Sequence, residues 1–220
     1  MRVDKDTLIF CSFSKVAGNN GCKMFNAAFN YYRLNALYKS FSIDNIKGAV
    51  NAARTLNFKG FAVSMPYKKE VLNFVDEVDE TAAEIGSANT VVINDNILKA
   101  YNTDYIAAKT LLREWYNNSF IGPNKLCILG DGGLAAAVKY AAKEIDMSFD
   151  VITRVNWGDI DGIENSIIFN CTPINNMLIN DSNIFINSSI TSTTGLRMSK
   201  IQASYQFKLY TGLEFPLVLT

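Results

Sequence analysis

The sequence predicts an α/β fold built as two domains. Across residues 7–102, apolar runs of strand length alternate with segments whose apolar residues recur at helical spacing, a pattern typical of a largely parallel sheet. A unit of strand, glycine turn, helix and strand follows at residues 125–154. Between them, residues 104–116 form a helix that could link two domains, and the turn-rich stretch 117–124 is the best candidate for a boundary.

The composition is that of a globular protein. Its 220 residues are 49% hydrophobic, which is enough for one large or two small domains. The 21 basic and 21 acidic residues cancel, so nothing suggests a nucleic-acid footprint or a polybasic membrane patch. No apolar run reaches the ~18 residues of a transmembrane helix, and the charged N-terminus leads into a strand rather than a signal peptide. We therefore expect neither a nucleic-acid nor a membrane partner.

Cysteine and histidine usage narrows the chemistry. The four cysteines form no CxxC pair and mostly lie in or beside apolar runs, which predicts buried free thiols and a cytoplasmic protein. The chain has no histidine, which excludes Ser-His-Asp and Cys-His catalysis and histidine-based metal sites. We expect no metal site, and acid–base chemistry must use Lys, Asp, Glu, Tyr or Cys.

Each element of the first domain has a local signal. Phe25, Phe29 and Tyr32 recur at helical spacing, Asp44 is a candidate N-cap, and the run Asn94-Asp95-Asn96 is a turn between two strands. The predicted elements, in order, are a strand at 7–13, a helix at 22–33, a strand at 37–43, a helix capped by Asp44, a strand at 60–65, an amphipathic segment at 68–78, a short helix at 81–85, and a hairpin of strands at 88–93 and 97–102.

The second domain is predicted from shorter signals. Ile201, Tyr205 and Leu209 are spaced as one face of a helix near the C-terminus. The stretch 177–194 is rich in Asn, Ser and Thr and leaves room for only a short strand. The predicted elements are strands at 125–129, 149–154, 167–171 and 184–186, with helices at 134–145 and 202–210.

Polar side chains follow several strands of the first domain. Pro66 cannot donate a ladder hydrogen bond and should end its strand, so Lys68 lies just past a strand end. Asn89 and Asp104 lie beside further strand edges, where ligands of open α/β sheets bind. Lys68 could instead be a surface lysine at a helix start, and Asp104 could be only a helix N-cap.

The glycine run 130–133 opens the helix of the second domain. Glycines at such a position let the backbone approach a pyrophosphate at the helix N-terminus, although tight turns also use glycine for structural reasons alone. Asp131 would repel a pyrophosphate unless it points away. Arg154 follows the next strand, and no acidic residue lies at this position. An arginine here suits the 2′-phosphate of NADP. Alternatively, Arg154 is a solvated surface residue.

Three blocks of this chain resemble motifs of the shikimate dehydrogenase family. The family patterns are Asn-Val-Thr-x-Pro-x-Lys, Gly-Ala-x-Asn-Thr and Asn-Thr-Asp. In this sequence Ala62 replaces the Asn and Ser64 replaces the Thr, and the form Ala-Val-Ser-Met-Pro looks most like the divergent shikimate-dehydrogenase-like branch. The matching residues are Val63, Pro66, Lys68, Gly86, Asn89, Thr90, Asn102, Thr103 and Asp104.

The resemblance implies a domain arrangement. It gives an N-terminal α/β substrate domain at 1–103, completed by 196–220, and a shortened Rossmann-like NADP-binding domain at 104–195. Gly195 would let the chain turn back, so that the C-terminal helix returns to the first domain with Gln202 facing the substrate.

The resemblance also implies an activity. It is the NADP-dependent reversible reduction of 3-dehydroshikimate to shikimate, or of a related cyclohexene or cyclohexane carboxylate, in aromatic amino acid biosynthesis. Lys68 would supply the proton for the developing alkoxide, and Asp104 would hydrogen-bond both Lys68 and a substrate hydroxyl. The alternative is a catalytically weak or inactive paralogue that binds a shikimate- or quinate-like ligand in a binding or regulatory role.

The implied site residues fall into two sets. Ser12 and Ser14 match the family's Ser-x-Ser, with Lys15 where a Pro is usual, although serine pairs are also common in loops. A buried Asn or Gln could equally satisfy backbone groups. We expect NADP rather than NAD, and a monomer or homodimer. The substrate set is Ser12, Ser14, Ser64, Lys68, Asn89, Asp104 and Gln202, and the cofactor set is Gly130, Gly132, Gly133, Leu134, Ala135, Thr153, Arg154, Thr172, Gly195 and Met198.

Overall fold

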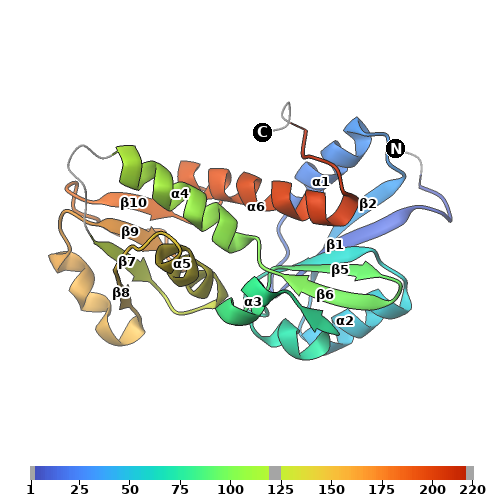
Figure 1. The fold of residues 1–220 in the computed structure, drawn as a ribbon, viewed down its shortest axis with the longest axis horizontal. Helices are drawn as coiled ribbons and strands as arrows, with labels where there is room; N and C mark the ends of the chain where they lie inside the picture. The colour runs from blue at the N-terminus through green and yellow to red at the C-terminus, as the bar shows by residue number, and fades with distance from the viewer. Residues whose placement is uncertain (1–2, 119–124, 217–220) are drawn as a thin grey trace. The chain divides into compact units, whose positions relative to one another are not determined.

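The computed structural model describes residues 3–118 and 125–216. The chain divides into two compact units, Met1–Thr103 with Ala203–Thr220, and Asp104–Gln202. Each unit contains one sheet with helices packed on it, so the predicted α/β class is confirmed (Figure 1). The predicted boundary stretch 117–124 lies largely outside the described residues.

The first unit contains a six-stranded sheet in the order β2-β1-β3-β5-β6-β4. β1 runs parallel to β2 and β3, whereas β5 is antiparallel to both β3 and β6. The sheet is therefore mixed, and the expectation of a largely parallel sheet is wrong at β5, although β4 is again parallel to β6. The strands are β1 Leu8–Ser14, β2 Ala36–Ser42, β3 Gly60–Val63, β4 Glu77–Val78, β5 Thr90–Asn94 and β6 Ile97–Tyr101.

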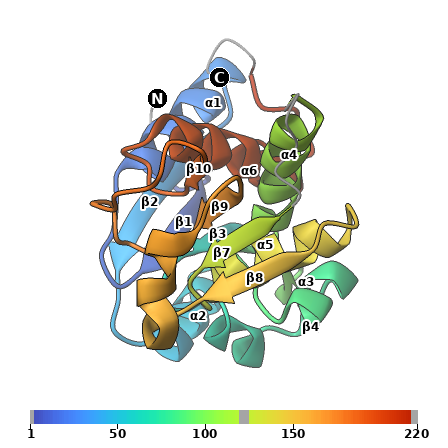
Figure 2. The same cartoon turned by 90° about the vertical axis from the view of Figure 1, so that its left-hand side faces the viewer.

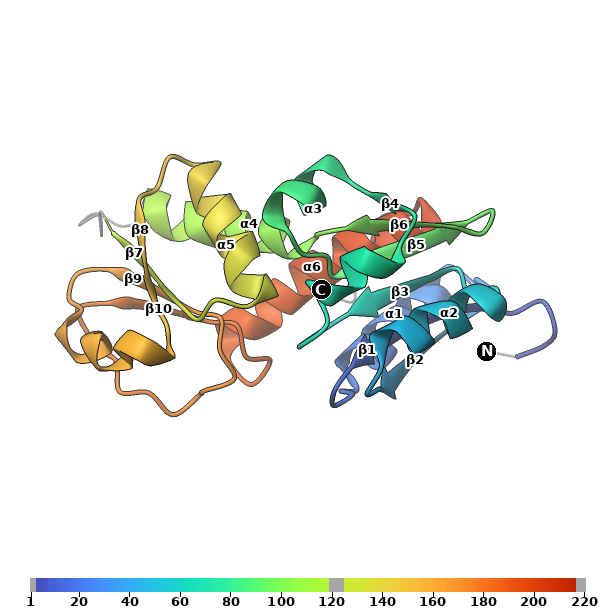
Figure 3. The ribbon, with the colours of Figure 1, turned by 90° about the horizontal axis from the view of Figure 1, so that it is seen from below.

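Helices cover both faces of this sheet. α2, Ile46–Thr55, packs on one face through Ile46, Val50 and Ala53 against β1 and β3 (Figure 3). On the other face lie α1, Asn20–Tyr31, and the end of α6, Thr193–Thr211. An aromatic cluster fills this second face, and we define it by Phe10, Phe25, Phe29, Tyr38, Phe207 and Tyr210.

The predicted N-cap in this unit is wrong by one residue. The N-cap of α2 is Asn45, whose side chain accepts a hydrogen bond from Gly48 N at 3.0 Å, while Asp44 pairs with Lys15. The amphipathic segment 68–78 contains the 3₁₀ helix η1, Glu70–Phe74, followed by β4. The predicted short helix is present as α3, Glu80–Ile85.

The second unit contains a parallel four-stranded sheet in the order β10-β9-β7-β8, which can be followed in Figure 2. From β7 the chain moves to β8 on one side and then crosses to β9 and β10 on the other. The carboxyl ends of β7 and β9 therefore flank a topological switch point, where ligands bind in open α/β sheets. The strands are β7 Leu126–Leu129, β8 Phe149–Ile152, β9 Ile167–Asn170 and β10 Ile184–Asn187.

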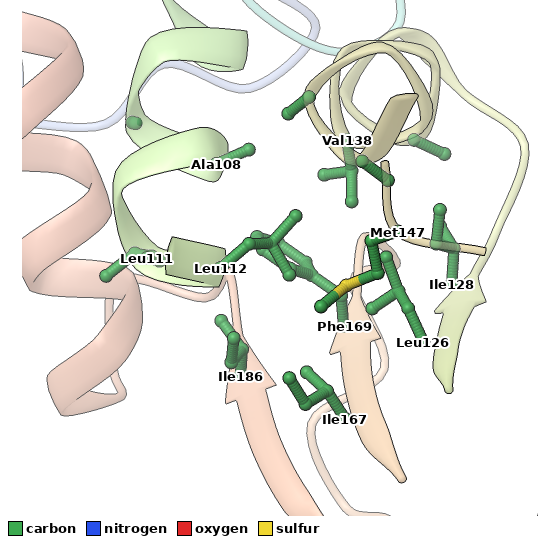
Figure 4. Packing of buried hydrophobic residues seen from close by; sticks show 14 of the residues in the cluster. Ala108, Leu111, Leu112, Leu126, Ile128, Val138, Met147, Ile167, Phe169 and Ile186 are labelled. Atoms are coloured by element: carbon green, nitrogen blue, oxygen red, sulfur yellow. The ribbon is translucent and has the colours of Figure 1, made fainter. Parts of the chain in front are cut away.

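The core of the second unit lies between this sheet and its helices. Figure 4 shows Leu112 of α4, Asp104–Asn118, and Val138 of α5, Gly133–Lys143, meeting Phe169 of β9 and Ile186 of β10. The opposite face of the sheet is covered by the 3₁₀ helix η2, Arg154–Gly162. No helix among the described residues is long and apolar enough to cross a membrane.

Helix α6 differs from its prediction. It begins at Thr193, and its residues up to Gln202 belong to the second unit, where Ile201 packs on the core. Tyr205, expected to face the first domain, is 43% exposed. The residues that pack in the first unit are instead Ala203 and Phe207, so the predicted apolar face of the helix is wrong.

Candidate functional site

Three serines lie at one edge of the first unit's sheet. β1 and β3 are parallel, with Phe13 opposite Val63, and Ser64 N continues the ladder by donating to Phe13 O at 2.9 Å. Ser12 and Ser14 follow Phe10 at every second position, so they are on the face that the aromatic cluster occupies. The carboxyl edge of β1 and β3 therefore carries these three hydroxyl groups together.

The serines differ in what their hydroxyls do. Ser14 is buried and donates to Val16 O at 3.0 Å. Ser12 is half-buried, while Ser64 is exposed. Burial raises the pKa of the neighbouring Tyr38 phenol.

Lys68 follows β3 on an anchored turn. Tyr67 is buried, its N donates to Ser64 O at 2.9 Å, and its hydroxyl donates to Ile43 O at 2.7 Å. Lys68 itself is half-buried, and its carbonyl accepts a hydrogen bond from Ala88 N at 2.8 Å. The backbone at Lys68 is thus fixed next to the start of β5.

Asn89 connects two of the sequence blocks. It is buried, and its Oδ1 accepts from Thr103 N at 2.8 Å while its Nδ2 donates to Thr103 Oγ1 at 3.0 Å. The amide thereby fixes the backbone one residue before Asp104, which begins α4 and is also buried. The sequence leaves two roles open for Asn89, binding substrate or satisfying backbone groups. The contacts in the structure are those of the second role.

Gln206 is a buried polar residue that the sequence analysis missed. Its Nε2 donates to Asn89 O at 3.1 Å and to Thr90 Oγ1 at 2.8 Å. The predicted residue was Gln202, which is half-buried and belongs to the second unit. The sequence does contain a signal for Gln206. It lies four residues after Gln202, and so about one turn further along the same face of the helix.

The glycine loop of the second unit lies at its switch point. Gly130 has φ +102, a left-handed conformation that favours glycine, and its N donates to Ile152 O at 2.7 Å. A Cβ there would lie 3.1 Å from Thr172 Cγ2, so the ends of β7 and β9 are in close contact. Gly132 precedes α5, and a Cβ on it would meet no atom of the described residues within 4 Å.

The rest of this loop offers mainly backbone. Gly133 is the first residue of α5, Leu134 is half-buried and Ala135 is fully buried against the core. Asp131 forms an ion pair with Lys139 at 2.5 Å. That pairing partly neutralises the carboxylate that the sequence placed next to an expected pyrophosphate.

The turns after β8 and β9 are shaped by polar side chains. Thr153 caps η2 by accepting from Val155 N at 3.4 Å, and Arg154, the first residue of η2, is exposed. Thr172 donates from Oγ1 to Asn170 Oδ1 at 2.7 Å. Asn170 is fully buried and was not among the predicted site residues, although it holds the Thr172 turn in place.

Gly195 and Met198 are both explained by packing within the second unit. Gly195 lies inside α6, where a Cβ would overlap the carbonyl oxygen of Ser189. The expectation that Gly195 turns the chain before the helix is therefore wrong. Met198 is buried in the core that α4 and α5 share. A role of either residue in cofactor binding stays a prediction.

Comparison with known proteins links both units to one family. Residues 15–91 match the family model described as the shikimate dehydrogenase substrate binding domain. The chain is 38% identical over 141 residues to the shikimate dehydrogenase-like protein of Haemophilus influenzae, covering 64% of this chain and 51% of that protein. It is 38% identical over 131 residues to the shikimate dehydrogenase (NADP(+)) of Methanococcus vannielii, covering 57% and 44%. The chain thus spans about half the length of these curated relatives.

A solved structure extends the similarity to nearly the whole chain. It is that of a shikimate 5-dehydrogenase-like protein, with 27% sequence identity and a TM-score of 0.79. The match covers 99% of this chain and 96% of that chain. The family model covers part of the first unit, but sequence similarity also reaches the second: the shikimate dehydrogenase (NADP(+)) of Clostridium beijerinckii is 29% identical over 221 residues, covering 87% of this chain and 81% of that protein.

Proposed function

We propose that this chain, which belongs to the shikimate dehydrogenase family, is an NADP-dependent dehydrogenase that interconverts 3-dehydroshikimate and shikimate or a closely related cyclohexene or cyclohexane carboxylate. The observation that carries the proposal is that hydrogen bonds connect the three sequence blocks that match the family motifs. The carbonyl of Lys68 binds Ala88 N, and the amide of Asn89 binds Thr103 N. These bonds fix the backbone at Lys68 and at the residue before Asp104.

The second unit has groups that fit a dinucleotide. The backbone of Gly130, Gly132 and Gly133 opens an 11-residue helix at a switch point, which suits a pyrophosphate. Arg154 is exposed after β8, where a guanidinium suits a 2′-phosphate, and the relative from Methanococcus vannielii is named for NADP(+). When bound, NADPH supplies the hydride for the ketone.

The remaining chemistry belongs to side chains of this protein. Reduction of a ketone leaves negative charge on its oxygen, and the Lys68 ammonium donates the proton there and stabilises the charge. Asp104 accepts a hydrogen bond from Lys68 and one from a substrate hydroxyl, and so directs the proton. Ser12 and Ser14 hold the substrate carboxylate, and Ser64, Asn89 and Gln202 complete the substrate set.

A spectrophotometric assay of shikimate-dependent NADP reduction tests this function. We expect turnover by the wild type and loss of ~10²–10⁴-fold in Lys68→Ala, the usual contribution of a positioned acid. Lys69→Ala is the matched control, since Lys69 is the exposed neighbour on the same turn. Lys68→Ala retaining more than about a tenth of the wild-type rate would remove Lys68 from this role. A wild type that binds shikimate or quinate without turnover would instead favour the non-catalytic paralogue.

A further inference from the structure

A chain of buried hydrogen bonds ends on the carboxamide of Asn89. Gln206 Nε2 donates to Thr90 Oγ1 at 2.8 Å, and Thr90 Oγ1 donates to Asn89 Oδ1 at 2.9 Å. The same carboxamide oxygen accepts from Thr103 N at 2.8 Å. All four residues are buried, and Thr90 is fully so. Side chains from α6 and β5 and the backbone before α4 therefore meet at one amide group.

Backbone groups at the two ends of this chain fix the direction of every proton in it. Thr103 N can only donate, so the Asn89 atom that it meets is the carboxamide oxygen. Asn89 O can only accept, so the Gln206 atom 3.1 Å from it is the amide nitrogen. Between these ends, the Thr90 hydroxyl must accept from Gln206 and donate to Asn89. The order of the protons is therefore unambiguous.

The backbone of Asn89 is fixed as well. Its N donates to Tyr101 O at 3.1 Å, and its O accepts from Val63 N at 2.8 Å, so the residue is held between the ends of β3 and β6. The carboxamide can therefore adjust only by rotation of its own side chain.

The two polar atoms of the Asn89 side chain have different tasks. Oδ1 has two lone pairs, and Thr103 N and Thr90 Oγ1 take both, while Thr103 Oγ1 is further away at 3.3 Å. Nδ2 carries two protons and donates to Thr103 Oγ1 at 3.0 Å. A contact between this carboxamide and a ligand therefore falls to Nδ2, which binds a hydrogen-bond acceptor.

We propose that Thr90 is a positioning residue whose hydroxyl, held by Gln206, occupies Asn89 Oδ1 and so presents Asn89 Nδ2 to a hydroxyl oxygen of the substrate. The inference rests on the proposed function, because that function places a ring hydroxyl at Asn89. The two roles that the sequence leaves open for Asn89 are then divided, since Oδ1 holds the backbone and Nδ2 binds the substrate. The chain is complete before the substrate arrives, so little freedom is lost on binding.

The test is whether Thr90 changes substrate affinity through Asn89. Shikimate is titrated calorimetrically into the wild type, Thr90→Val, Asn89→Ala and the double variant. Thr90→Val replaces the hydroxyl with a methyl group and should weaken shikimate binding about fivefold, the usual contribution of one neutral hydrogen bond. In the Asn89→Ala background, the same change should alter the affinity by less than about twofold. Thr90→Ser keeps the hydroxyl and should bind shikimate as the wild type does.

Thr211→Val is the matched control. Thr211 belongs to the same unit, and its hydroxyl donates to Phe207 O at 2.7 Å. The substitution removes a hydroxyl hydrogen bond that does not involve Asn89, so it should lower the Tm without changing the affinity for shikimate. A purely structural role of Thr90 would give the same pattern as this control.

Each other result has a definite meaning. If Thr90→Val weakens binding equally with and without Asn89, or leaves it unchanged, the positioning role is overturned while the proposed function stands. If the wild type binds neither shikimate nor quinate, the proposed function is overturned and the inference with it. Where Thr90→Val does not fold, Gln206→Met takes its place, because it removes the donor that holds the Thr90 hydroxyl. Asn89→Ser likewise replaces Asn89→Ala, and equal weakening in both backgrounds again overturns the inference.

Discussion

The hydroxyl of Tyr210 is buried and has no hydrogen-bond partner among the residues that the structure describes. Its ring is 5.0 Å from that of Phe10 and 5.8 Å from that of Phe25, measured between centroids. The ring also covers Gly60, where a Cβ would lie 2.7 Å from it. Burial raises the pKa of this phenol well above its ordinary value. Contacts of the ring thus hold the side chain in place, whereas burying its hydroxyl group is energetically unfavourable.

Removing that hydroxyl should therefore stabilise the protein. A buried polar group without a partner costs ~1–3 kcal/mol, and Tyr210→Phe removes the group while retaining the ring contacts. The small gap that the oxygen leaves reduces the gain, so we expect an increase of about 1 kcal/mol in the free energy of unfolding. For a chain of this length, that corresponds to a rise in Tm of roughly 2–4 °C.

Differential scanning calorimetry of matched variants measures this effect. The control is Tyr67→Phe, which removes a hydroxyl of a buried tyrosine that donates to Ile43 O at 2.7 Å, and should lower the Tm. The reasoning is refuted if Tyr210→Phe also lowers the Tm. That result would mean that the Tyr210 hydroxyl is hydrogen-bonded in solution, for example to an enclosed water.

Three further substitutions test other features. Gly195→Ala places a methyl group onto a backbone carbonyl within the second unit, so it should lower the free energy of unfolding by more than about 2 kcal/mol, and an unchanged melting curve would contradict this. Hydrogen bonding by Arg54 lowers the pKa of Asp76, so the stabilisation is complete above the unfolded pKa of about 3.9 and is lost as the pH falls through the folded pKa. Asp76→Asn should therefore destabilise the protein at pH 7 by up to about 1 kcal/mol, with a smaller difference from the wild type at pH 3 in urea titrations. Arg154→Ala should reduce a preference for NADP over NAD by about tenfold in calorimetric titrations, whereas the exposed Arg113→Ala should leave it unchanged.

The hairpin of β5 and β6 could be predicted because its signal is local. Asp95 and Asn96 adopt left-handed conformations with φ values of 48 and 66, which a two-residue hairpin turn of this type requires and which Asn and Asp tolerate. The direction of β5 against β3 could not be predicted in the same way. Apolar runs show that a strand is buried, but its neighbour and direction depend on how the chain returns from residues 64–89.

Capping was predictable only to within one residue. Asp44 and Asn45 are both good N-cap residues, and the choice between them depends on where the first helical turn begins. In the structure, the pairing of Asp44 with Lys15 joins the ends of β1 and β2, a contact that spans 29 positions of the sequence. Local propensity carries no information about such a partner.

The polar contacts of α6 show why the candidate site was only partly predictable. The sequence predicts a single apolar stripe, but the residues of this helix divide between two cores, with Met198 and Ile201 in one and Ala203 and Phe207 in the other. The residues that face a core therefore do not follow one row at i, i+4 and i+8. The motif spacing predicts Gln202 as the site residue. The glutamine that donates a hydrogen bond to the carbonyl of Asn89, 117 positions earlier, is instead Gln206. Only the assembled sheet provides that carbonyl as an acceptor, so the contact depends on tertiary structure and not on helical periodicity.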